Sequence, residues 1–190
     1  MGAAEGTAQA GHELLLQLAG RVPDELLWRM RNWLAAGDSD ALSATLPRTL
    51  LRHRIGITDS ERALLAQVVV PGSPSRRLVD AVLAGAPPPP PSFGPGEANL
   101  SAWSAVSVVS SVGAGELLVA ARDDAARVLL VRAADRPVEL TAVLQRLLRV
   151  HGEHVPQVEV WVGDDPPTPY HAAACAAAAS LWSRSPAPTG

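Results

Sequence analysis

The sequence contains no lysine: all 16 of its basic residues are arginine. A chain without lysine cannot form a Schiff base with a substrate, use lysine as a general base or hold a nucleotide phosphate with the lysine of a P-loop. Alanine, glycine and proline are abundant, a composition typical of a GC-rich genome. We therefore interpret the missing lysine as compositional bias and expect a bacterial protein.

Cysteine is nearly absent too, since Cys175 is the one cysteine in 190 residues. A single cysteine excludes a disulfide within the chain and a zinc site built from several thiolates. A single cysteine suits a reducing compartment. Residues 1–11 lack the basic start and the apolar block that are typical of a signal peptide. We therefore expect a cytoplasmic protein.

Long apolar runs and a strong net charge are also missing. The longest uncharged stretch that could be mistaken for a membrane span, residues 98–115, contains five serines and is too polar to cross a bilayer. The formal net charge is −3, which gives no reason to expect nucleic acid or a membrane surface as the default partner.

Apolar residues at helical spacing dominate residues 12–85. Glycine, proline and capping residues mark the boundaries, including a capping box formed by Thr58 and Glu61. The pattern predicts an all-α module of about five short helices. Residues 1–11 show no such spacing and are expected to be a disordered lead-in.

Residues 86–99 form a linker rich in proline and glycine, with five consecutive prolines at 87–91. Consecutive prolines favour an extended polyproline II rod, which holds its neighbours apart. We therefore predict a domain boundary with a stiff spacer. The alternative is a docking peptide for a polyproline-binding domain.

Residues 100–184 predict a small β-β-β-α-β-α domain with a mixed sheet, followed by a tail at 185–190. Its centre is a β-α-β crossover, in which a strand at 127–133 leads through an amphipathic helix to a parallel strand at 157–162. The sequence leaves residues 103–112 open between strand and helix, because the valines favour a strand while the serines recur every three residues; we predict a strand. The fold class is thus a mixture of α+β and α/β.

The clearest polar groups follow the strand at 157–162. Asp164 and Asp165 lie just beyond the carboxyl end of that strand, where open α/β sheets bind ligands, and His171 and Cys175 would share one face of the next helix. These four residues predict a site for a small enzyme or a metabolite-binding domain. The competing interpretation is a solvated turn followed by a small core cysteine.

Two histidines at positions 151 and 154 have a spacing that can bind zinc or nickel. Gly152 ends the helix between them and no third ligand is evident nearby, so we predict no metal site and no cofactor.

Arginines gather at Arg48, Arg52 and Arg54, and the first two share a helical face. They could bind an acidic protein or, as a weaker alternative, the phosphates of a nucleic acid. Residues 1–86 contain nine arginines and nine acids, so the module has no overall basic field and nucleic acid is not favoured.

Tryptophan is common for so few aromatic residues, with five against one tyrosine and one phenylalanine. Trp28 lies off the apolar stripe of its helix, and Trp161 points to the strand face opposite its valine neighbours. Because tryptophan is enriched at interaction hot spots, both are candidate contact residues. Burial inside the fold is the alternative for each.

Strong folding signals and weak chemical signals together predict a non-enzymatic adaptor within a multi-protein system. Its expected contact residues are Trp28, Arg48, Arg52, Arg54 and Trp161. The sequence does not identify the partner or the oligomeric state.

Overall fold

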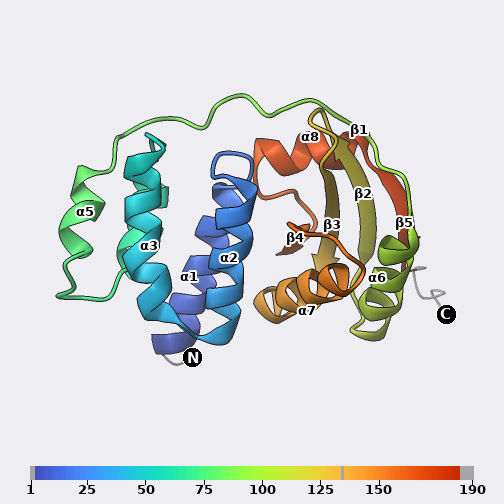
Figure 1. Cartoon of the computed structure of the whole chain (residues 1–190), viewed down its shortest axis with the longest axis horizontal. Coiled ribbons are helices and arrows are strands. Elements are labelled where there is room, and N and C mark those ends of the chain that lie inside the picture. Colours follow the sequence, from blue (N-terminus) through green and yellow to red (C-terminus); the bar gives the residue numbers. More distant parts are fainter. Residues whose placement is uncertain (1–2, 134, 185–190) are drawn as a thin grey trace. The chain divides into compact units, whose positions relative to one another are not determined.

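The structure is a computed structural model that describes residues 3–133 and 135–184 (Figure 1). The chain divides into two compact units, Met1–Pro89 and Pro90–Gly190, and the division falls inside the proline run. Helices occupy the first unit and a five-stranded mixed sheet lies in the second, so the fold belongs to the α+β class. This confirms the predicted order of a helical module followed by a mixed-sheet domain. The tail at 185–190 lies outside the described residues.

Five helices make up the described part of the first unit, as the boundary signals predict. They are α1 (Ala3–Gln17), α2 (Asp24–Ala36), α3 (Ser39–Arg52), α4 (Asp59–Val68) and α5 (Arg76–Ala81). The expectation of a disordered lead-in is wrong from Ala3 onward, where α1 begins. Alanine is the best helix former, and Ala10 is buried in the core, so tertiary packing extends this helix beyond its leucine-rich part.

Leucines from α1, α3 and α4 fill the core of the first unit, and a buried ion pair lies among them. The Arg21 guanidinium donates to the Glu61 carboxylate and to the carbonyl of Gly56, and both charged side chains are buried. Glu61 also accepts a hydrogen bond from the backbone N–H of Thr58 at 2.8 Å, which completes the predicted capping box of α4. One carboxylate thus joins a helix cap to the segment after α1.

The sheet of the second unit is mixed. Its strands are β1 (Phe93–Pro95), β2 (Glu116–Arg122), β3 (Arg127–Ala133), β4 (Gln157–Val162) and β5 (Ala179–Ser183). The order is β1-β2-β3-β4, and β5 pairs with β2 beyond the end of β1. Strands β3 and β4 are parallel and α7 (Pro137–Val150) connects them, which confirms the predicted crossover.

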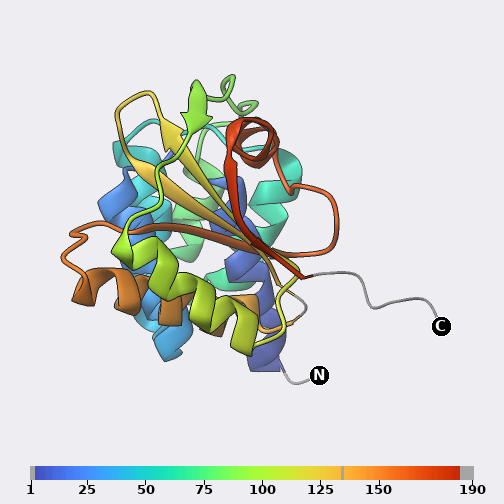
Figure 2. The ribbon, with the colours of Figure 1, turned by 90° about the vertical axis from the view of Figure 1, so that its right-hand side faces the viewer.

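Helices cover the two faces of this sheet unequally (Figure 2). Helices α6 (Leu100–Ser111) and α7 lie side by side against the face that carries Leu117, Leu129 and Val158. Helix α8 (Pro169–Ala177) lies against the opposite face, where it contacts β1, β2 and β3. The alternation of side chains along each strand decides which residues meet which layer.

The strand predicted at residues 103–112 is wrong, because this segment belongs to α6. Asn99 caps the helix by accepting from the N–H of Ala102 at 3.0 Å, and Ala102, Ala105 and Val109 turn toward the sheet at helical spacing. Strands β1 and β5 already occupy the edge of β2 on that side. Packing on the sheet therefore overrides the strand preference of the valines.

Two further boundaries differ from the prediction. The predicted β-β-β-α-β-α order ends the domain with a helix, but α8 ends at Ala177 and the chain continues as a further strand, β5, along β2. Residues 93–95 of the predicted linker form β1 instead, and the Phe93 ring packs edge-on against that of Tyr170 at 5.2 Å between centroids. In both places pairing with β2 supplies long-range contacts that no local pattern reveals.

Candidate functional site

Helix α6 is unusual because none of its residues is charged, although much of its outer side meets solvent. Leu100 is 73% exposed and Trp103 is 53% exposed. Large apolar side chains on a solvent-facing helix normally stand among charged residues, which α6 lacks. Its exposed polar residues are serines, whose small side chains do not cover the larger exposed apolar side chains.

Helices α6 and α7 run antiparallel to each other. At one end, the Ser101 hydroxyl donates to the Glu153 carboxylate just beyond α7 at 2.5 Å, and Glu153 is paired with Arg127 at 2.6 Å. At the other end, Val112 lies near Arg136, where α7 begins. The polar anchor at the first end fixes the start of α6 against the end of α7.

A groove of about 490 Å³ separates the two helices at the end where α7 begins. Its wall is mostly apolar, and three charged residues stand along it. The lining residues are Val108, Val112, Ala133, Asp135, Arg136, Glu139, Leu140 and Val143. We use the name α6–α7 face for the solvent-facing side of these two helices, whose exposed large apolar residues are Leu100, Trp103, Val112, Val143 and Val150. Leu100 and Trp103 are not among the residues that line the groove.

A second candidate is a chain of buried polar side chains on the opposite side of the sheet. Nε2 of His171 lies 3.1 Å from the carboxylate of Glu159, and Nδ1 lies 2.7 Å from the hydroxyl of Thr168. His171 and Glu159 are fully buried. Thr168 also caps α8 by accepting from the N–H of His171. The arrangement fastens the start of α8 to β4.

Trp161 belongs to the same buried region and is only 6% exposed. Its ring meets that of His171 with 5.9 Å between centroids. The prediction that Trp161 points away from the valine face of β4 agrees with this position, but its side chain is covered and does not form an outer contact surface. The position of Trp161 therefore fits the alternative interpretation, in which the side chain is buried inside the fold.

The four residues predicted as a ligand site do not behave as one group. Asp164 is almost fully exposed and makes a 3.2 Å ion pair with Arg132, and Asp165 is exposed as well. His171 is enclosed in the polar chain described above. Across residues 3–133 and 135–184, no three His, Cys, Asp or Glu side chains are grouped so that they could hold a metal ion.

Cys175 is half-buried on α8. Burial raises the pKa of its thiol, and the nearby carboxylate of Glu116 raises that pKa further. An activated cysteine needs the opposite setting, a positive environment that favours the thiolate. The electrostatics around Cys175 therefore suit a packing residue rather than a nucleophile.

The raised pKa of the Cys175 thiol predicts slow alkylation in the folded chain. We expect Cys175 of the folded chain to react with iodoacetamide at pH 7 about tenfold more slowly than in urea, because the raised pKa lowers the thiolate fraction. Mass spectrometry of timed samples would measure both rates. The variant Glu116→Gln should react faster than the natural chain, since one negative charge is removed. Equal rates in folded and unfolded chains would contradict the pKa direction.

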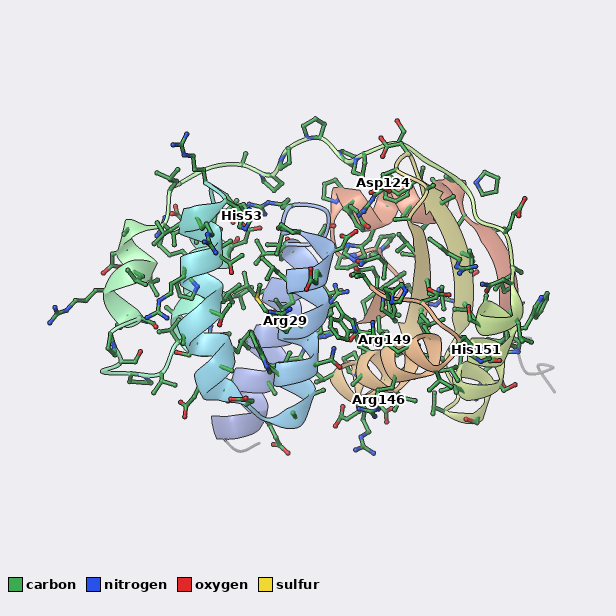
Figure 3. The ribbon with its side chains drawn as sticks, viewed as in Figure 1. Arg29, His53, Asp124, Arg146, Arg149 and His151 are labelled. Carbon is green, nitrogen blue, oxygen red and sulfur yellow. The ribbon has the colours of Figure 1, made fainter. Side chains whose placement is uncertain are left out.

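In the first unit, the predicted arginines lie at the end of α3. Arg48, Arg52 and Arg54 are all exposed. His53, labelled in Figure 3, is the C-cap of this helix. Arg54 adopts a left-handed backbone with φ of 53°, which turns the chain away from the helix. Trp28 is half-buried on α2 and its backbone carbonyl accepts from Asn32 at 2.8 Å.

Sequence reasoning missed the α6–α7 face. Trp103 stands in an uncharged segment between serines, a pattern that could have drawn attention to it. Assigning the segment to a strand placed the residue in the sheet instead. The groove depends on how α6 and α7 pack against each other, which no local pattern indicates.

Comparisons of the chain with protein-family models, with curated proteins and with solved structures found no match. In the part of the chain that the structure describes, no helix has the length and apolar character required to span a membrane.

Proposed function

We propose that this protein is a non-enzymatic interaction protein that binds another protein through the α6–α7 face. The observation that carries the proposal is Trp103, whose ring is half exposed on a helix without charged residues. Tryptophan supplies a large contact area at a small cost in side-chain entropy and is enriched at binding hot spots. Leu100, one helical turn before it, is still more exposed.

The arginines of α3 provide a second surface in this proposal. An adaptor must contact two partners or two parts of one assembly, and the exposed guanidinium groups of Arg48, Arg52 and Arg54 suit an acidic protein surface. Trp28 is half-buried and would contribute through its exposed part. Trp161 does not contribute to either surface in this proposal, because its side chain is buried.

The bacterial cytoplasm remains the proposed setting. It is supported by the single cysteine, which fits a reducing compartment, and by the composition typical of a GC-rich genome.

The proposal predicts that Leu100→Ser combined with Trp103→Ser weakens partner binding at least about tenfold, because hot-spot side chains contribute more than about 1–2 kcal/mol each. A photo-crosslinking amino acid at position 107 would identify the partner in cells. Titration calorimetry with the purified partner would then compare the natural chain with the double variant. Ser110→Ala, an exposed change on the same helix, is the control. The proposal would be refuted if the double variant bound the partner with unchanged affinity while its circular dichroism spectrum matched that of the natural chain.

A further inference from the structure

The proline run, Pro87–Pro91, is open to solvent. Its first four prolines are exposed and the fifth is half-buried. The chain is fixed on both sides of the run. Before it, the N–H of Gly85 donates to the carbonyl of Ile57 at 3.0 Å, and after it the carbonyl of Ser92 accepts from the N–H of Asp123 at 3.1 Å. Between these two anchors, no hydrogen bond joins the run to any other residue that the structure describes.

Covalent geometry makes the run a stiff polyproline II helix. Each proline ring fixes φ, and each residue that precedes a proline is restricted to an extended ψ. Such a helix has about three residues per turn and rises about 3.1 Å per residue, so five prolines cover about 15 Å. Rings three positions apart lie on the same side, which forms two apolar ridges, Pro87 with Pro90 and Pro88 with Pro91. Because this shape exists before binding, a partner would lose little affinity to the ordering of the chain.

The exposed atoms of the run define the chemistry that would recognise it. Proline has no N–H, so the run offers carbonyl oxygens as acceptors and no backbone donors. It therefore cannot be added as a strand to the edge of a sheet, which requires donors and acceptors in alternation. A partner must donate hydrogen bonds from its side chains and present flat apolar surfaces to the rings. Tryptophan and tyrosine do both, because each combines an aromatic ring with a donor group.

The lack of charge around the run narrows the partner further. Residues 81–96 contain no charged side chain. A groove that selects its peptide through an ion pair would find no counter-charge beside the prolines. The groove that fits this segment therefore recognises rings and carbonyl groups alone.

We propose that the proline run is a binding segment for a second protein, which holds it in an uncharged groove lined by tryptophan and tyrosine side chains. This is the known mode of recognition for polyproline II segments. The run belongs to neither surface of the proposed function, so this proposal does not depend on the α6–α7 face. A run that serves only as a spacer between the two units would have no such partner.

The first arm of the experiment measures binding of the full chain to a panel of purified WW and EVH1 domains, which hold prolines in aromatic-lined grooves. We expect at least one domain to bind the natural chain. Pro88→Ala combined with Pro90→Ala should weaken that binding at least about tenfold, because it removes one ring from each ridge. The matched control is Pro71→Ala combined with Pro166→Ala, two exposed prolines outside the run. No binding by any domain, or equal binding by the two double variants, would overturn the proposal.

The second arm separates a binding segment from a spacer. A photo-crosslinking amino acid at the exposed position 86 would label the partner in cells, and a synthetic peptide of residues 86–92 is added to the lysate before irradiation. We expect the peptide to abolish the cross-link, and mass spectrometry to map the cross-link beside tryptophan or tyrosine residues of the partner. A spacer acts only within its own chain, so a cross-link that the peptide leaves unchanged would overturn the proposal, as would no cross-linked protein. The Leu100→Ser, Trp103→Ser chain should give the same result as the natural chain, which keeps this test distinct from that of the proposed function.

Discussion

Replacing His171 by alanine is expected to destabilise the second unit by about 4 kcal/mol. The imidazole makes hydrogen bonds to Glu159 and Thr168, each worth about 0.5–1.5 kcal/mol net, and truncating a large buried side chain adds about 2–5 kcal/mol for lost contacts and the cavity. A domain is typically stable by about 5–15 kcal/mol, so the loss would be a large part of the total.

Urea unfolding followed by circular dichroism measures this effect, and hydrogen exchange of peptides from β4 and α8 assigns it to the second unit. His151→Ala is the control, because His151 is exposed at the end of α7 and its loss should change the unfolding free energy by less than about 0.5 kcal/mol. Thr168→Val should have an intermediate effect of about 1–2 kcal/mol, through loss of the helix cap and one hydrogen bond. Identical midpoints for the His171 and His151 variants would contradict the role of the buried chain.

Replacing Glu61 by alanine is expected to destabilise the first unit by about 3–5 kcal/mol. The change removes the carboxylate that accepts from the buried Arg21 guanidinium, and breaking a buried ion pair from one side leaves a charge without its counter-charge. It also removes half of the capping box at Thr58, so the start of α4 loses a hydrogen bond at the same time.

A double variant separates the charge from the packing. Arg21→Met combined with Glu61→Leu removes both charges and keeps apolar volume, so it should recover much of the stability lost in Glu61→Ala. Glu25→Ala is the control for a carboxylate in an exposed ion pair, here with Arg29 at 2.8 Å. Arg29 is labelled in Figure 3. Exposed pairs contribute about 0–1 kcal/mol. A double variant no more stable than Glu61→Ala would show that helix capping, rather than the buried charge, dominates.

Local patterns predicted the helices of the first unit well. Leucines at helical spacing and the capping box at Thr58 describe interactions between residues close in sequence, and such interactions persist in the folded unit. The amphipathic spacing along α7 predicted its buried side for the same reason.

The candidate site was predicted less well. Of the four residues of the predicted ligand site, His171 alone belongs to the buried polar chain, and its partner Glu159 was not singled out. The sequence shows that Glu159 alternates with valines along β4. It does not show that α8 packs on the same face of the sheet, which is what brings His171 to Glu159. Contacts of this kind depend on which strand face each helix covers.

Composition and short-range spacing were enough to establish the α+β class, the helical first unit, the parallel crossover and the absence of lysine-dependent chemistry. Long-range packing was needed to turn residues 100–111 into a helix, to place β1 and β5 along one edge of β2, and to open the groove beside α7. The physical reason is that valine, serine and alanine have weak intrinsic preferences, so the free energy of burying them against a particular neighbour decides their structure.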